Sequence, residues 1–220
     1  ELGLLKMDFL GLRNLTVIKN AINNIKFCKD TELNINTIDM NKKEVYSLIA
    51  SGNTDGVFQL ESAGMKNFMR ELKPTCMEDV IAGIALYRPG PADSIPKYIE
   101  SKNNHNKISY KHPILKPILE STYGCIVYQE QVMQIVQTMA GYSLGRADVL
   151  RKAMGKKKPE VILKEKNAFI YGDDEVCGAV KNGVSEEVAE SIFNDMADFG
   201  KYAFNKSHAA AYSLVTYQTA

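Results

Sequence analysis

The sequence predicts a mainly α-helical fold with a few short β-strands. Apolar residues recur at helical spacing over most of the chain, as Val132, Ile135, Val136 and Met139 do between 129 and 140. Short apolar runs at 4–10, 56–60 and 124–128 are the candidate strands. With 45% hydrophobic residues, a chain of 220 residues can bury the core of one large domain or two small ones.

Local signals place the helices in order. Asn41 with Glu44 is a plausible start, and Ser143 is a plausible cap for a helix that turns Ala147, Leu150 and Met154 inward. The two prolines on either side of Gly90 predict the end of the preceding helix. Residues 92–122 are predicted to form a looser, exposed connection. The predicted helices cover 12–27, 41–51, 61–72, 75–86, 129–140, a stretch after 143, 159–181, 185–198 and 205–219.

Composition narrows the class of protein. Lys and Arg number 27 against 26 Asp and Glu, so any contact with nucleic acid is expected to be local. No apolar run approaches the ~20 residues of a membrane span, and no signal peptide is recognisable. The four cysteines form no CxxC pair and are expected to be buried thiols in a reducing cytosol. We therefore expect a cytoplasmic protein without a membrane partner.

Both ends of the sequence look cut. The run 4–10 resembles a strand that starts without a preceding polar tail, and Thr219 and Ala220 fall inside an apolar helical pattern. We therefore expect a piece of a longer polypeptide.

A basic cluster is the strongest local charge feature. Six of the 27 cations fall within thirteen positions around 153–155: Arg146, Arg151, Lys152, Lys156, Lys157 and Lys158. Arginine forks and lysine point charges at a helix end suit a ligand with several phosphates. A solvated helix end explains them as well, because cations near a helix C-terminus suit the macrodipole. Neither GxxxxGK[ST] nor GxGxxG is present, so the phosphates would be held mainly by side chains.

Asp8 and Lys6 point the same way if 4–10 is a strand. A carboxylate and a cation on one face could hold Mg²⁺ and a phosphate. One carboxylate alone is an incomplete magnesium site, and a surface ion pair is the alternative interpretation.

Arg88 lies in a stiff loop that follows an apolar helix. A rigidly presented guanidinium suits a phosphate or a base, because less conformational freedom is lost on binding. It could equally cover the helix end.

The segment 204–212 combines several binding residue types. Lys206 near a helix N-terminus opposes the dipole unless an anion lies there, which hints at a phosphate. His208 and Tyr212 are four residues apart, so the two rings share a face and could stack on a base. The three alanines between them also suit tight helix packing.

These stretches together resemble the alpha subunits of bacterial DNA polymerase III, the C-family replicative polymerases, over nearly the whole chain. The resemblance rests on several runs in the family's order: KMDFLGLR at 6–13, TDGVFQLES at 54–62, YRPGP at 87–91, YQEQ at 128–131, LRKAMGKK at 150–157 and FNKSH at 204–208.

The resemblance implies the end of a polymerase-β-like palm over 1–30 and a helical fingers domain over 31–220, with possible subdomains 31–110 and 111–220. Three palm aspartates would hold two Mg²⁺ ions; Asp8 matches the third and Lys6 the basic residue beside it. Arg151 and Lys152 match the pair that grips the incoming triphosphate, although many relatives have two arginines. Further expected contacts are Arg88, Lys206, His208 and Tyr212 in the nucleotide or templating-base pocket, and Lys156, Lys157 and Lys158 steering DNA.

The implied reaction adds deoxynucleoside triphosphates to the 3′ end of a primer in chromosomal replication. The implied partners are primer–template DNA, the rest of the polymerase and other replisome subunits. This piece alone is expected to be inactive, because one metal-binding aspartate of three cannot assemble the site. The residues also allow a non-enzymatic helical module that binds the DNA backbone, or a helical regulatory domain that senses a nucleotide and does not need Asp8.

Overall fold

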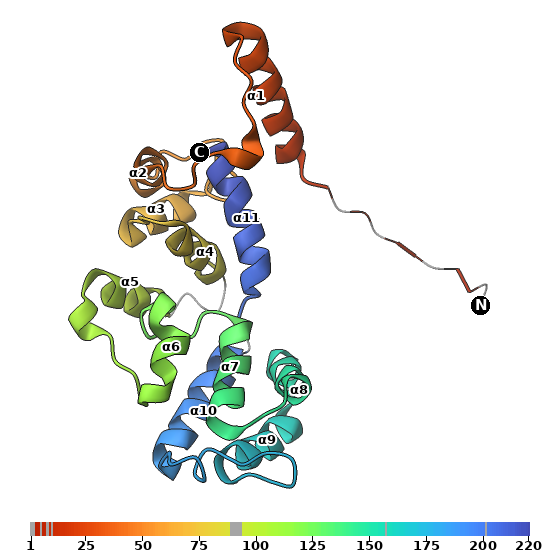
Figure 1. The fold of residues 1–220 in the computed structure, drawn as a ribbon, viewed down its shortest axis with the longest axis vertical. Helices are drawn as coiled ribbons and strands as arrows, with labels where there is room; N and C mark the ends of the chain where they lie inside the picture. The colour runs from red at the N-terminus through yellow and green to blue at the C-terminus, as the bar shows by residue number, and fades with distance from the viewer. Residues whose placement is uncertain are drawn as a thin grey trace.

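The computed structural model describes residues 3–4, 6–7, 9, 11–88, 94–156, 158–200 and 202–220, and these residues are predominantly helical (Figure 1). The α-helices are α1 (Arg13–Lys29), α2 (Lys43–Ser51), α3 (Ala63–Leu72), α4 (Met77–Leu86), α5 (Ile95–Asn103), α6 (Lys116–Leu119), α7 (Gln129–Ala140), α8 (Leu144–Gly155), α9 (Pro159–Tyr171), α10 (Glu186–Gly200) and α11 (Lys206–Thr219). Short 3₁₀ turns are η1 (Ile35–Thr37), η3 (His105–Lys107), η4 (Pro113–Leu115) and η5 (Glu120–Thr122).

The predicted helices are confirmed where capping and apolar spacing agree. Helix α7 has the predicted bounds, and the Ser143 hydroxyl accepts the Arg146 backbone N–H at 3.3 Å at the start of α8. Leu150 and Met154 are fully buried below the outer face of α8. Helix α2 begins at Lys43, and the expected Asn41 cap is not used.

The strand predictions differ from the structure. Within the described residues, β-pairing is confined to one isolated parallel bridge between Tyr128 and Phe204. Residues 55–59 form turns, with Gln59 at φ +67°. The described residues between 3 and 9 are not in a strand, and Asp8 lies outside the described residues, so the palm strand stays a prediction.

Two stretches depart from the predicted helix pattern. Helix α9 ends at Tyr171 instead of 181, because Gly172 has φ +86°, a backbone conformation that leaves the helix and that glycine adopts without steric strain. The predicted loose connection at 92–122 contains α5 and α6, and Tyr98 and Leu119 from it are buried in the core.

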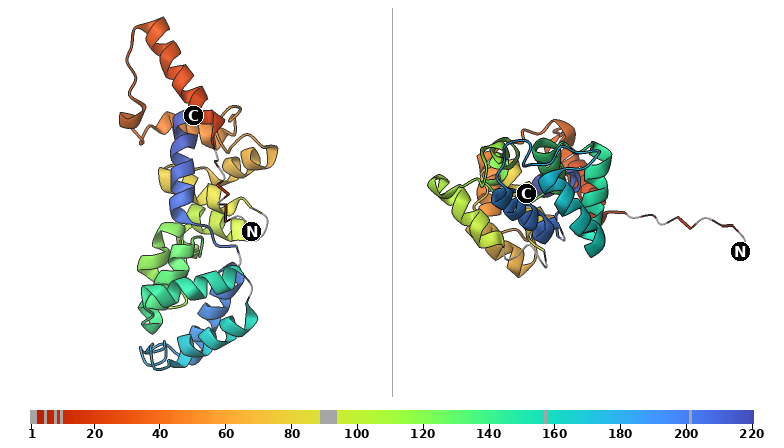
Figure 2. Two further views of the ribbon diagram at one scale, coloured as in Figure 1. Left: turned by 90° about the vertical axis from the view of Figure 1, so that its right-hand side faces the viewer. Right: turned by 90° about the horizontal axis from the view of Figure 1, so that it is seen from below.

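The molecule is elongated (Figures 1 and 2). Its core consists of two hydrophobic clusters. One lies among α2, α3, α4 and α11 and includes Tyr98, Val127 and Tyr128. The other lies among α6, α7, α8, α9 and α10. The last helix therefore returns to pack on α4, and residues 125–128 join the two clusters. The palm boundary at 30 and the fingers subdivision at 110 stay proposals.

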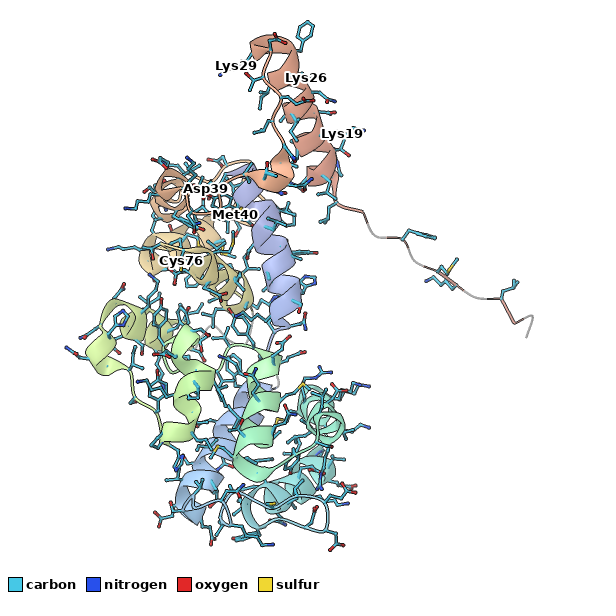
Figure 3. The ribbon with its side chains drawn as sticks, viewed as in Figure 1. Lys19, Lys26, Lys29, Asp39, Met40 and Cys76 are labelled. Carbon is cyan, nitrogen blue, oxygen red and sulfur yellow. The ribbon has the colours of Figure 1, made fainter. Side chains whose placement is uncertain are left out.

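Helix α1 projects from one end of the molecule and contains no buried residue (Figure 1). It packs against α11. Figure 3 shows Lys19, Lys26 and Lys29 along this helix, remote from the helices of the second cluster.

The cysteines are free thiols, and only Cys125 is buried. The expectation of buried thiols is therefore wrong for Cys28, Cys76 and Cys177, which are exposed. Among the described residues, no helix is both long and apolar enough to cross a membrane.

Candidate functional site

The bridge between Tyr128 and Phe204 brings the starts of α7 and α11 together. The Phe204 N–H donates to the Val127 carbonyl at 3.3 Å, and the Gln129 N–H donates to the Phe204 carbonyl at 2.9 Å. Residues about 75 positions apart in sequence therefore share one short piece of backbone pairing. The predicted nucleotide contacts Arg88, Arg151, Lys206 and His208 lie around this bridge.

Arg151 and Lys152 share one carboxylate on α8. Arg151 donates to Asp148 Oδ1 through Nε at 3.0 Å and Nη2 at 2.6 Å, and Lys152 Nζ lies 2.6 Å from Asp148 Oδ2. Hydrogen bonds from Lys152 and Arg151 lower the pKa of Asp148 below its usual range, so this carboxylate is charged at neutral pH.

Arg151 also reaches the bridge. Its Nη1 donates to Gln129 Oε1 at 2.9 Å, while Gln129 Nε2 donates to the Ala203 carbonyl at 2.9 Å. Arg88 approaches from another side, with its guanidinium carbon 3.9 Å from the centroid of the Phe204 ring. Arg88 is exposed at the end of α4. Arg151 and Arg88, both predicted to contact a nucleotide, are thus connected through the segment 203–204.

Lys206 is paired with protein carboxylates. Its backbone N–H lies 3.1 and 3.0 Å from the two Glu130 carboxylate oxygens, and its Nζ lies 3.0 Å from Glu78 Oε2. Asn205 caps α11 by accepting the His208 N–H at 2.8 Å. The unfavourable position of Lys206 in the helix dipole therefore has an intramolecular explanation, and it no longer requires a phosphate.

The His208 and Tyr212 rings lie on one face of α11, as the four-residue spacing predicts. Their centroids are 4.1 Å apart, and His208 also meets Phe204 edge-on at 5.2 Å. Tyr212 packs edge-on against Phe58 at 5.2 Å, which fixes the inner ring while His208 remains exposed. The exposed ring is the one that a base could reach.

Arg146 does not belong with the other cations of the basic cluster. It bonds Glu165, Asp173 and Glu175 with only 12% of its side chain exposed. Its guanidinium holds the pKa of Asp173 well below the usual range. Arg146 is therefore engaged in joining α8 to α9 and the loop after it.

Lys156 and Lys158 are exposed and, with Lys152, line a hollow of about 220 Å³ whose apolar wall includes Val149 and Val161. Lys157 lies outside the described residues. A larger hollow of about 500 Å³ lies between α5 and α10 and is lined by none of the predicted site residues.

The predicted metal site is not assembled from the described residues. Lys6 is exposed, whereas Asp8 lies outside the described residues. No group of three His, Cys, Asp or Glu side chains that could hold a metal occurs in the part of the chain that the structure describes.

Sequence reasoning did not single out the acidic and amide partners of these cations. Asp148 lies three and four residues before Arg151 and Lys152, a spacing that signals ion pairs on a helix. Gln129 and Glu130 offered no such signal, because their partners lie more than twenty residues away.

Comparison with known proteins identifies the family to which the chain belongs. The model of the bacterial DNA polymerase III alpha subunit finger domain matches residues 14–176. The DNA polymerase III alpha subunits of Halalkalibacterium halodurans, Pseudomonas aeruginosa and Escherichia coli are 49%, 50% and 48% identical to the chain over 99% or more of its length. The chain spans 19% of the length of each of these relatives. It belongs to the family of bacterial DNA polymerase III alpha subunits, and within that family it corresponds to the fingers region.

Proposed function

We propose that this chain is the nucleotide-binding part of a DNA-directed DNA polymerase that adds deoxynucleoside triphosphates to a primer 3′ end in chromosomal replication. The observation that carries the proposal is the convergence of Arg151, Arg88 and the 204–208 segment on the Tyr128 to Phe204 bridge. Membership in the polymerase family supports the same reading.

The cations would neutralise the phosphates of the incoming nucleotide. Arg151 offers a planar fork of donors, and Lys152, with 58% of its side chain exposed, offers a mobile point charge. Both are paired with Asp148, so triphosphate binding would exchange a carboxylate partner for phosphate oxygens. Arg88 and Lys206 add charge at the bridge, and the exposed His208 ring, which packs on Tyr212, offers a stacking surface for a base.

Metal binding belongs to the proposal for the complete polymerase. Asp8 is the proposed ligand that this chain contributes to a site for two Mg²⁺ ions, with Lys6 as its basic neighbour. The described residues do not make up such a site, so no step proposed here depends on a metal ion.

The proposed partners follow from the same proposal, that the chain is part of a DNA polymerase. They are primer–template DNA, the remaining domains of the polymerase and other replisome subunits, in the cytoplasm. Lys156, Lys157 and Lys158 would attract DNA through a field that falls off within about 10 Å at 0.1 M salt.

Binding of a fluorescent deoxynucleoside triphosphate tests the proposal. Arg151→Ala and Lys152→Ala should each weaken binding, Arg151→Ala by about tenfold or more, because a charge-assisted contact contributes about 1.5–3 kcal/mol. Lys166→Ala is the matched control, since Lys166 pairs with Glu190 between α9 and α10. Equal affinity of Arg151→Ala and the control would contradict the proposal.

Binding of the DNA backbone without nucleotide binding is the second candidate. The hollow with Lys152, Lys156 and Lys158 at its edge favours it. In that case Lys156→Ala and Lys158→Ala would lower DNA affinity and reduce the salt slope by about one each, and triphosphates would not bind.

A further inference from the structure

Gln129 occupies the contact point between α8 and the start of α11. It is the first residue of α7, and its backbone N–H donates to the Phe204 carbonyl at 2.9 Å. Both polar atoms of its side-chain amide form hydrogen bonds: Nε2 donates to the Ala203 carbonyl, and Oε1 accepts a hydrogen bond from Arg151 Nη1, each at 2.9 Å. One side chain therefore joins the predicted triphosphate contact to the segment that leads into Lys206 and His208.

The hydrogen bonds of Arg151 indicate which part of its guanidinium remains for a ligand. A guanidinium has five N–H donors. Nε and Nη2 bond Asp148, and Nη1 bonds Gln129. Beyond these three bonds, each terminal nitrogen retains one N–H that can donate to a phosphate oxygen.

We propose that Gln129 is a positioning residue for triphosphate binding, which holds the Arg151 guanidinium in place and links its orientation to the 203–208 segment. The inference rests on the proposed function and deepens it. Arg151 has four side-chain torsions, and a partner at the tip of the side chain restricts them before the ligand arrives. Less side-chain freedom is then lost on binding.

This role differs from a general role in folding. A residue that only stabilises the start of α7 would change triphosphate affinity independently of Arg151. A residue that acts by orienting Arg151 has no effect once Arg151 is gone. The two roles therefore predict different coupling energies in a double-mutant cycle.

The experiment measures binding of fluorescent deoxyadenosine triphosphate to the wild-type chain, Gln129→Ala, Arg151→Ala and the double variant. Gln129→Ala should weaken binding by about threefold to tenfold, which corresponds to immobilising one long side chain. The double variant should bind as weakly as Arg151→Ala alone. Gln134→Ala is the matched control, because Gln134 is an exposed glutamine on the same helix and should bind like wild type.

Gln129→Met keeps the length and bulk of the side chain without its polar atoms. It should reproduce the loss seen with Gln129→Ala, and thermal unfolding followed by circular dichroism checks that each variant is folded.

The outcomes separate the two proposals. If wild type does not bind the triphosphate, or if Arg151→Ala binds as well as wild type, the proposed function fails. If Arg151→Ala loses binding while Gln129→Met matches Gln134→Ala, the positioning role alone is overturned. Fully additive effects of Gln129→Ala and Arg151→Ala would also overturn it.

Discussion

In the proposed nucleotide site, Asp148 is the residue that would compete most directly with a triphosphate. Its carboxylate is charged at neutral pH and accepts from both Lys152 and Arg151, whose hydrogen bonds lower its pKa further. We expect Asp148→Asn to bind a fluorescent deoxynucleoside triphosphate about threefold to tenfold more tightly, because a repelling charge is removed and both cations are released from it. The measurement is an equilibrium titration at fixed salt.

Asp195→Asn is the control for the change in net charge. Asp195 is a half-exposed carboxylate on α10 that pairs with Lys111, and it lines the larger hollow, which contains none of the predicted site residues. Weaker triphosphate binding by Asp148→Asn than by Asp195→Asn would show that Asp148 orients Arg151 instead of competing for it.

At the residue scale, the sequence pointed to the cationic side chains of the candidate site, but not to the carboxylate and amide groups that pair with them. Spacing predicted that His208 and Tyr212 share a face, and the rings do lie together. The argument that Lys206 needs a nearby anion was sound, but the anions are Glu78 and Glu130. Helix periodicity predicts contacts only between residues about three or four positions apart. It therefore cannot identify Glu130, which lies 76 positions from Lys206.

At the scale of elements, Arg146 stabilises the packing of α8 on α9. Its side chain is mostly buried and bonds Glu165, which is only 9% exposed, together with Asp173. Arg146→Ala should destabilise the chain by about 3 kcal/mol, because it leaves Glu165 buried without its cation. Urea denaturation followed by circular dichroism at pH 7 measures the difference.

The same variant predicts a pH dependence. The Arg146 guanidinium lowers the pKa of Asp173, so this interaction adds stability above the ordinary carboxyl pKa of about 3.9, and the stability is lost as pH falls through the lowered value. The difference between wild type and Arg146→Ala should therefore shrink below about pH 4. Lys166→Ala breaks a more exposed ion pair in the same region, so it should lower the free energy of unfolding by less than about 1 kcal/mol at pH 7. An equal loss of stability in both variants would contradict the special role of Arg146.

Element boundaries followed local signals where these were strong. Ser143 and the apolar residues of α8 gave a start and a buried face that the structure confirms. The end of α9 was missed because apolar residues continue past Gly172, whose backbone conformation breaks the helix. The runs at 56–60 and 124–128 were predicted as strands from composition, although a strand also needs a partner, and Tyr128 finds one only in its single bridge to Phe204.

At the scale of the whole molecule, the sequence could not show that α11 packs on α4 while α10 belongs to the other cluster. Both helices have apolar faces, and periodicity does not tell which face meets which helix. The candidate site depends on this long-range arrangement, because the chain crosses between the clusters at 125–128 and again at 203–205. Sequence motifs predicted Arg88, Arg151 and Lys206 as ligand contacts, but only the fold shows that they lie around one bridge.

The arrangement also predicts where the molecule opens most readily. Helix α1 has no buried residue, and its sequence RNLTVIKNAINNIKFCK is rich in β-branched residues and asparagine, which favour helices weakly. Helix α4 has eight of its ten residues buried. Hydrogen exchange followed by mass spectrometry should therefore show α1 amides exchanging by local opening, orders of magnitude faster than those of α4, whose exchange should approach the global unfolding limit. Protection of α1 equal to that of α4 would mean that contacts beyond those with α11 stabilise it.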